Sequence, residues 1–171
     1  KYSSTAKALA DTTYSNTDKS NGDIPEGKFI SIATGNSQTC ALGRNREINC
    51  WGQDYFNVIS AFPEGQMRMI TAGGGQFCAL NDERDLICWG DTGFVDIPTG
   101  KFDRVSLGYH SGCALDEDGD ITCWGLNEEV PNTHSQNASF VQLDVGESHA
   151  CALDELSFLY CWGDDTNGKN E

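Results

Sequence analysis

The sequence predicts an all-β protein that is built from repeated sheets, each closed by its own disulfide. A unit of the form Gly-x4-Cys-Ala-Leu-x7-Cys-Trp-Gly occurs four times within 171 residues. All eight cysteines and all four tryptophans lie inside these copies, at the same offset in every copy. A period of roughly 35–38 residues is typical of proteins whose units bury apolar surface by stacking on one another. The copies span residues 35–52, 73–90, 108–125 and 146–163.

The copies divide the chain into one array and two flanking segments. Residues 1–24 are rich in Ser, Thr, Asp and Asn, so we expect either a solvated leader or the remnant of a preceding repeat. Residues 164–171 follow the last copy and are expected to be a tail or the start of a further linker. Each of the four prolines precedes one copy, which sets the expected repeats at 25–52, 63–90, 98–125 and 131–163.

Within each copy, the two cysteines are expected to lie opposite each other on a hairpin. In the first copy, residues 40–42 and 48–51 are predicted to be short strands, because the polar turn 43–47 separates them. A symmetric hairpin places Cys40 opposite Cys50, and opposed Cβ atoms lie about 4.5–5.5 Å apart, close to the spacing a disulfide needs. The same rule predicts the pairs Cys40–Cys50, Cys78–Cys88, Cys113–Cys123 and Cys151–Cys161.

Both faces of each predicted sheet are apolar. Side chains alternate along a strand, so Cys40 and Leu42 point to one side while Ala41 and Trp51 point to the other. A sheet that is apolar on both faces has to be covered on both, so we expect the sheets to stack face to face. All the tryptophans are then expected to be buried between sheets: Trp51, Trp89, Trp124 and Trp162.

Composition excludes several classes of partner. The formal net charge is −15, with 26 acidic against 11 basic residues, and such a surface repels the phosphates of nucleic acids and anionic membranes. Membrane insertion is not expected either, because no apolar run approaches the roughly 20 residues of a membrane helix. Paired cysteines favour an oxidising, extracellular location. No Cys-x2-Cys pair occurs and histidine is scarce, so neither a metal site nor a cofactor is expected.

Enzymatic activity is not expected, because the polar residues mostly repeat with the units and the three histidines have no free cysteine to activate. One acidic stretch partly matches the pattern of a calcium loop. Asp116, Asp118 and Asp120 match the first ligand positions of a calcium loop, but Ile121 stands where that loop requires Gly. An acidic hairpin turn is the favoured interpretation, and weak calcium binding is the alternative.

Aromatic residues in the linkers are candidate contacts for a partner: Tyr55, Phe56, Phe94 and Tyr109. Rigid aromatic side chains can anchor a protein or a glycan; the alternative is that these rings pack over sheet edges. Asn137-Ala138-Ser139 is the only N-glycosylation sequon and lies in an inserted polar loop, so Asn137 is a candidate glycosylation site.

The unit resembles the regulator of chromosome condensation repeat, which reads Pro-x-Gly-x-Phe, an apolar strand, Gly-x4-Cys-Ala-Leu, a turn and Cys-Trp-Gly. Residues 25–52 and 98–125 match this pattern almost throughout, and the resemblance covers about residues 25–163. It implies β-propeller blades, usually about seven in a ring. The two-cysteine version is similar to the secreted branch of the family, which includes bacterial surface proteins and ectodomains of Crinkly-type plant receptor kinases. The nucleotide-exchange and β-lactamase-inhibiting activities of other members are not implied, because their contact loops are not shared.

Four blades of this width are not expected to close a ring. An apolar face would then remain at each end, with residues such as Phe29, Ile32 or Trp162 near water. We therefore expect an extracellular structural or assembly protein that self-associates head to tail into a ring or a filament. The alternative function is an extracellular recognition module that binds a protein or glycan through its loop aromatics. The rival explanation of open ends is a trimmed part of a longer propeller.

Overall fold

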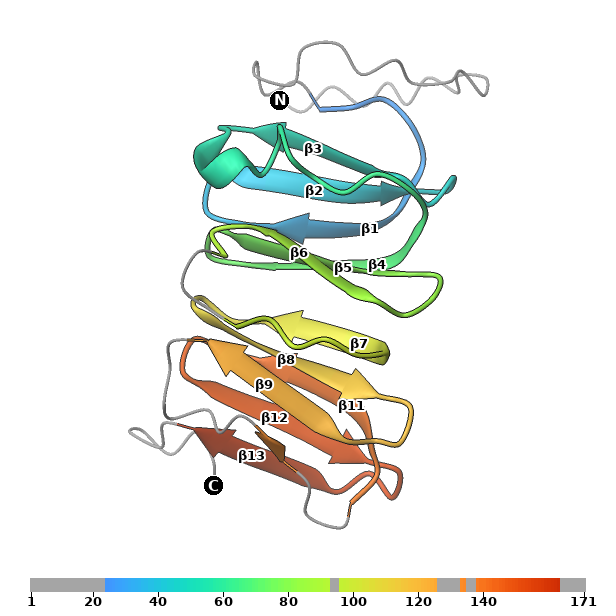
Figure 1. Cartoon of the computed structure of the whole chain (residues 1–171), viewed down its shortest axis with the longest axis vertical. Helices are drawn as coiled ribbons and strands as arrows, with labels where there is room; N and C mark the ends of the chain where they lie inside the picture. The colour runs from blue at the N-terminus through green and yellow to red at the C-terminus, as the bar shows by residue number, and fades with distance from the viewer. Residues whose placement is uncertain (1–23, 93–95, 126–132, 135–137, 164–171) are drawn as a thin grey trace, which may run out of the picture.

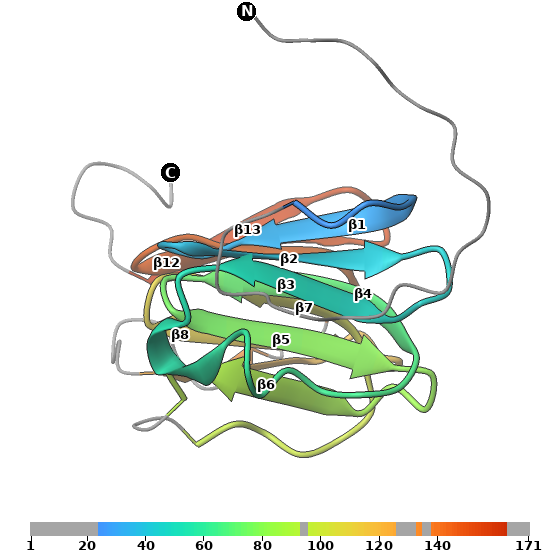
Figure 2. The same cartoon turned by 90° about the horizontal axis from the view of Figure 1, so that it is seen from above.

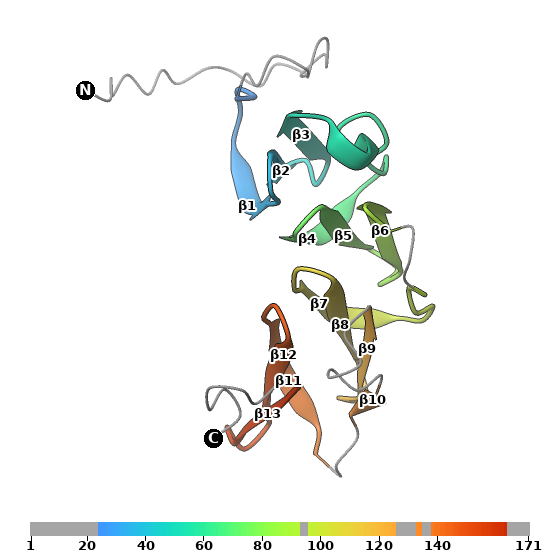
Figure 3. The ribbon, with the colours of Figure 1, turned by 90° about the vertical axis from the view of Figure 1, so that its left-hand side faces the viewer.

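Four antiparallel sheets follow one another along the molecule (Figure 1). The computed structural model describes residues 24–92, 96–125, 133–134 and 138–163. The expected leader up to residue 23 and the expected tail 164–171 therefore lie outside the described residues. Viewed from one side, the sheets lie along an open arc that has the form of part of a propeller (Figure 3). Within the described residues, no helix has the length and apolar character needed to span a membrane.

The three main strands of each sheet come from one repeat and lie in chain order. The first sheet contains β1 (Phe29–Thr34), β2 (Gln38–Gly43) and β3 (Ile48–Gly52). The second contains β4 (Met67–Gly73), β5 (Gln76–Asn81) and β6 (Leu86–Gly90). The third contains β7 (Phe102–Leu107), β8 (Ser111–Asp116) and β9 (Ile121–Gly125). The fourth contains β11 (Phe140–Val145), β12 (His149–Asp154) and β13 (Leu159–Gly163).

Two further elements lie in the linkers. The third sheet gains an outer strand, β10 (Thr133–His134), which precedes the fourth sheet in the chain and pairs with β9. The 3-10 helix η1 (Tyr55–Asn57) follows the first sheet. Viewed onto the first sheet, η1 lies beyond the end of β3 (Figure 2). The linkers thus place polar and aromatic residues at the ends of the strands.

A disulfide joins the second and third strands of every sheet. The bonds are Cys40–Cys50, Cys78–Cys88, Cys113–Cys123 and Cys151–Cys161. Each pair is directly opposed in the strand register, with Cα atoms 3.9–4.1 Å apart. The predicted fold class, an all-β array of blades with one disulfide within each blade, is confirmed.

The two faces of a sheet have different residues and different neighbours. We call the side that carries both cysteines the cysteine face, and the opposite side, which carries the tryptophan, the tryptophan face. The cysteine face of the first sheet packs on the tryptophan face of the second, where Leu42 and Ile48 share one core with Phe77 and Trp89. The same arrangement joins the second sheet to the third and the third to the fourth. All sheets therefore stack in the same direction.

The stacking direction decides which apolar residues remain near water. The first sheet has no described sheet over its tryptophan face, so Trp51 is half-buried, and the expectation that all tryptophans are buried is wrong at this residue. Trp162 is only 7% exposed because its face packs on the third sheet, so the expectation of water near this ring is also wrong. Ile32 is exposed as expected, and Phe29 is half-buried.

The strand ends gather at two opposite sides of the array. We call one side the glycine end, where the first strand of each sheet turns into the second, and the other the hairpin end, where the second turns into the third. A Cβ atom on Gly73 would lie 1.9 Å from the carbonyl oxygen of Gly108, and one on Gly108 would lie 1.9 Å from that of Gly146. The first glycine of the repeat is thus required by the close approach of the neighbouring blade's backbone.

Candidate functional site

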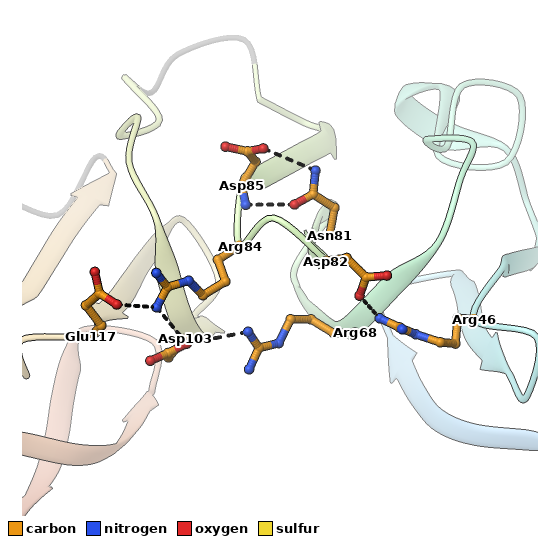
Figure 4. A network of polar contacts seen from close by, with 8 residues as sticks. All are labelled: Arg46, Arg68, Asn81, Asp82, Arg84, Asp85, Asp103 and Glu117. Atoms are coloured by element: carbon orange, nitrogen blue, oxygen red, sulfur yellow. Dashed lines mark hydrogen bonds and ion pairs between the residues drawn. The ribbon is translucent and has the colours of Figure 1, made fainter.

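The hairpin end carries ion pairs that connect successive sheets (Figure 4). Arg84 on the second sheet binds Glu117 on the third, with Nη1 and Oε2 2.7 Å apart, and lies 3.6 Å from Asp103. Arg46 on the first sheet bonds Asp82 on the second in the same way, and Arg68 lies 3.4 Å from Asp103. These basic side chains are therefore engaged within the array.

Backbone hydrogen bonds reinforce the same contacts. The fourth residue of each hairpin turn has a left-handed backbone, as in Arg46 (φ 67°) and Arg84 (φ 68°). Its carbonyl accepts the N–H that opens the next sheet: Met67 donates to Arg46 at 2.7 Å, and Phe102 donates to Arg84 at 2.9 Å. The hairpin end thus holds neighbouring blades together.

Polar contacts at the hairpin end also lower the pKa of two carboxyl groups. The pKa of Glu117 is lowered by the hydrogen bond and the charge of Arg84. The pKa of Asp85 is lowered by its hydrogen bonds to Lys101 and Asn81. Both carboxylates are solvent-accessible, so each pair is a modest, salt-sensitive contribution to stability. The contacts at the hairpin end are therefore best explained as structural links between successive sheets.

The acidic stretch that resembles part of a calcium loop is a hairpin turn. Asp116 Oδ1 accepts the backbone N–H groups of Asp118 at 3.1 Å and Asp120 at 2.9 Å. Asp154 makes the equivalent bonds to Leu156 and Phe158 in the fourth sheet. Among the described residues, no group of His, Cys, Asp and Glu could hold a metal ion. The aspartates at the start of these turns are explained by backbone capping.

The glycine end brings two of the predicted aromatic residues together. A Cβ on Gly75 would lie 3.0 Å from Phe56 Cδ2, and a Cβ on Gly74 would lie 3.4 Å from Tyr109 Cδ2. Both rings are exposed, and they therefore flank two consecutive residues that have no side chain. Tyr55 is also exposed on the same linker. Phe94 and Asn137 lie outside the described residues.

Local contacts hold the aromatic linker in place. Asp54 Oδ1 accepts the N–H of Ile59 at 2.7 Å, and Gln38 Nε2 donates to the carbonyl of Tyr55 at 3.2 Å. Phe56 (φ 59°) and Asn57 (φ 57°) both have left-handed backbones, a conformation that costs about 1–3 kcal/mol each and is typical of functional sites. The backbone of this linker is therefore held by its own polar contacts, and the exposed Phe56 ring projects from it.

Sequence reasoning missed two parts of this surface. Asp91 lies beside Gly75, with its Cβ 3.3 Å from where a Cβ on that glycine would be, and its N–H donates to the Gly75 carbonyl at 3.1 Å. The Gly73-Gly74-Gly75 run was the available signal, since it is the only copy with three glycines at this turn.

The two end sheets form a second candidate site. Ile32 on the first sheet is 63% exposed, whereas Ile70 at the same repeat position in the second sheet is 5% exposed. On the fourth sheet, Leu159 is 65% exposed, whereas its counterpart Ile121 in the third sheet is 2% exposed. The first sheet thus presents a tryptophan face and the fourth a cysteine face.

Comparison with known families identifies the repeat. The family model "Regulator of chromosome condensation (RCC1) repeat" matches residues 102–129, and the repeat pattern and sheet order extend this unit to the other copies. The matched copy and the other three share the pattern of two cysteines joined by a disulfide within each sheet. No curated protein sequence matches the chain.

Several solved structures share the arrangement of the sheets. The ectodomain of the Physcomitrella patens receptor kinase CR4 is similar, with a TM-score of 0.69 and 29% identity over 82% of this chain. The CRINKLY WD40 ectodomain of the Arabidopsis thaliana receptor kinase ACR4 has a TM-score of 0.68 and 28% identity over 79% of this chain. Yeast RCC1 (Prp20), solved with Kap60, shares the fold at a TM-score of 0.67 and 15% identity over 84% of this chain.

The chain spans half or less of the length of these three structures. It spans 40% of the CR4 ectodomain, 50% of the ACR4 ectodomain and 45% of Prp20. The four described sheets therefore correspond to part of a propeller.

Proposed function

We propose that the chain is an extracellular, non-catalytic assembly module whose two end sheets dock head to tail on further copies of itself. The contrast between Ile32 and Ile70 carries this proposal, because two residues at one repeat position differ only in whether a sheet covers them. Such an exposed apolar sheet face is typical of an interaction surface.

The two kinds of sheet face indicate which surface docks on each end of the array. Every interface within the array joins a cysteine face to a tryptophan face. A second copy can repeat this contact by placing the cysteine face of its fourth sheet on the tryptophan face of the first, so that Leu159 of one copy covers Ile32 of the other. This contact is heterologous, and it produces a ring or an open filament according to its rotation.

One edge position supports the same docking. Arg68 and Asp103 occupy the second residue of the first strand in the second and third sheets, and they form an ion pair across that interface. Ile30 and Val141 occupy this position in the first and fourth sheets, and both are exposed. Docking with the interior geometry would place these two apolar side chains side by side, where they bury each other.

Two further proposals follow from the chemistry and the comparisons. The disulfide in every sheet and the similarity to plant receptor ectodomains support an extracellular location. We also propose that the stacking units are residues 25–52, 63–90, 98–125 and 131–163, with 1–24 and 164–171 as flanking segments.

Sedimentation equilibrium of the purified chain, with its disulfides intact, tests the assembly. We expect the average mass to rise with concentration for the wild-type chain. Ile32→Asp and Leu159→Asp should each yield monomers, because a carboxylate on either face would be buried without a partner in the docked state. Tyr55→Asp is the matched control, since Tyr55 is exposed but lies at the glycine end; this variant should assemble like the wild type. A wild-type chain that stays monomeric at all concentrations would contradict the proposal.

The second candidate function is recognition through the loop aromatics. The observation that favours it is that the exposed rings of Phe56 and Tyr109 lie next to Gly75 and Gly74. Binding of a protein or glycan probe that is lost on replacing either ring would support this function.

A further inference from the structure

The segment that leads into a sheet packs against the sheet before it. We define the entry segment as running from the residue before the proline to the first residue of the first strand, so that the first three sheets have the entry segments 24–29, 62–67 and 97–102. Phe62 lies in the core between the first and second sheets, and Ile97 lies in the core between the second and third. Both entry segments that follow a described sheet therefore contribute an apolar side chain to the interface.

Entry segments also make polar contacts with the preceding hairpin turn. Lys101 Nζ lies 2.7 Å from Asp85 Oδ1, and the N–H of Phe102 donates to the carbonyl of Arg84 at 2.9 Å. Ser157 occupies the turn position of Arg84 in the fourth sheet, and its backbone is left-handed in the same way (φ 68°). The fourth turn thus has the backbone form that receives an entry segment within the array.

The first entry segment has no described sheet before it. Ile24 stands at the position of Phe62 and Ile97 and is 76% exposed, whereas both counterparts are partly buried. Lys28 stands at the position of Lys101 and is exposed as well. The first entry segment therefore presents an apolar side chain and a cation to water.

The fourth hairpin carries exposed apolar side chains in place of polar ones. Leu156, Phe158 and Leu159 are all exposed, and we call these three residues the apolar hairpin. The residues at the positions of Leu156 and Phe158 in the other three turns are all polar: Asn45, Glu47, Glu83, Asp85, Asp118 and Asp120. A cluster of exposed apolar side chains at one end of the array is typical of an interaction site.

We propose that the apolar hairpin binds the entry segment of a second copy, as an interior turn contacts the entry segment that follows it. Repeat equivalence places Ile24 of the second copy over Leu159, because Ile97 shares one core with Leu86, the counterpart of Leu159. This inference rests on the head-to-tail assembly proposed above, and it adds a contact that lies outside the paired sheet faces. A second copy fits both halves, since each end lacks the element that the other end supplies.

The same equivalence pairs Lys28 with Phe158. Within the array, Lys101 lies beside Asp85, and Phe158 occupies the turn position of Asp85. An aromatic ring attracts an ammonium group and also packs against the aliphatic stem that carries it. The ring of Phe158 can therefore take the place of the carboxylate in binding the lysine of the second copy.

A mixed dimer isolates this contact. The Ile32→Asp chain keeps its fourth sheet intact, and the Leu159→Asp chain keeps its first sheet and entry segment intact, so the pair forms a single interface. Phe158→Ala is added to the first chain, and Ile24→Ala or Lys28→Ala to the second. Sedimentation velocity then gives the Kd of every combination, and thermal unfolding of each chain establishes that the fold is retained.

We expect Ile24→Ala and Phe158→Ala each to weaken the mixed dimer by about tenfold or more, because an apolar side chain loses its burial. Lys28→Ala should weaken it by about twofold to thirtyfold, the range of a cation–π contact. Lys28→Ala and Phe158→Ala together should cost less than the product of their separate losses, since both remove one contact. Phe56→Ala in either chain is the matched control: it removes an exposed ring at the glycine end and should leave the Kd unchanged.

The outcomes separate this contact from the assembly itself. A mixed dimer whose Kd is unchanged by Ile24→Ala or by Phe158→Ala would overturn the contact while head-to-tail docking of the sheets remains supported. Fully multiplicative losses from Lys28→Ala and Phe158→Ala would also overturn it, because the two side chains would then act independently. The absence of any mixed dimer would contradict the assembly and, with it, the contact.

Discussion

The interior and terminal sheets carry nearly the same repeat but have different surroundings. The second and third sheets are covered on both faces, and Ile70 and Val105 of their first strands are buried. Among the described residues, the first and fourth sheets are each covered by a neighbouring sheet on one face only, and Ile32 and Leu159 are exposed. A repeat residue is therefore buried by the neighbouring sheet, and its own sequence context does not determine its exposure.

The largest expected difference between interior and end concerns the tryptophans. Trp89 is buried and donates from Nε1 to the Val58 carbonyl at 3.1 Å, whereas Trp51 is half-buried. Trp89→Ala should lower the free energy of unfolding by about 3–5 kcal/mol, the cost of a large cavity in a core. Trp51→Ala should cost less than half of that. Urea unfolding under non-reducing conditions measures both, and equal losses would contradict the contrast.

Alanine substitutions at the first glycine of the repeat should show the same contrast between interior and end sheets, with a smaller loss of stability. Gly73→Ala and Gly108→Ala would push a methyl group into the next blade's backbone and should cost about 1–3 kcal/mol, as in overpacked cores. At Gly146, in the fourth sheet, the three atoms nearest to the added methyl would belong to the His149 ring, and a side chain gives way more easily than backbone. Gly146→Ala should therefore be the mildest of the three in the same unfolding assay. A Gly146 variant as damaged as the Gly73 variant would contradict this account.

Much of the fold could be predicted because the repeat encodes it. The offset between the cysteines fixed the hairpin register, and the alternation of Ala41 and Trp51 with the cysteines fixed the two faces. The direction of stacking could not be predicted, since both faces are apolar. This is why Trp51 and Trp162 were assigned the wrong surroundings.

The candidate sites were harder to predict than the fold. Phe56 and Tyr109 are 53 residues apart in sequence numbering (109 − 56), and nothing in either linker indicates that both border Gly74 and Gly75. Asp91 gave no signal because single aspartates are common in loops. Such sites depend on how blades bring their turns together, which the repeat pattern alone does not specify.

The disulfides should differ in how readily they are reduced. Both sulfurs of Cys113–Cys123 belong to buried residues, whereas Cys151 and Cys161 are half-buried on the uncovered face of the fourth sheet. A thiolate has to reach the bond in order to attack it. Brief exposure to dithiothreitol, followed by alkylation and mass spectrometry, should show Cys151–Cys161 reduced before Cys113–Cys123. The reverse order would argue that a partner already covers the fourth sheet.

The smallest expected effect concerns pH. The pKa of Glu117 is lowered in the folded state by Arg84, so this pair stabilises the protein above the ordinary carboxyl pKa. The contribution is lost as pH falls through the lowered pKa. Arg84→Gln should therefore be slightly less stable than wild type at neutral pH, and the difference should shrink as the pH falls below the ordinary glutamate pKa of about 4.3. Arg44→Gln, which changes an exposed arginine on the end sheet, is the control and should show no such pH dependence.

Mixing the two end-face variants tests the central claim most directly. Ile32→Asp blocks the tryptophan face of the first sheet, and Leu159→Asp blocks the cysteine face of the fourth, so neither variant can assemble with itself. Mixed together, they retain one intact face each, and light scattering after size exclusion should show a one-to-one dimer that stops growing. A mixture that stays monomeric, or a Leu159→Asp chain that dimerises alone, would contradict head-to-tail docking of complementary end sheets.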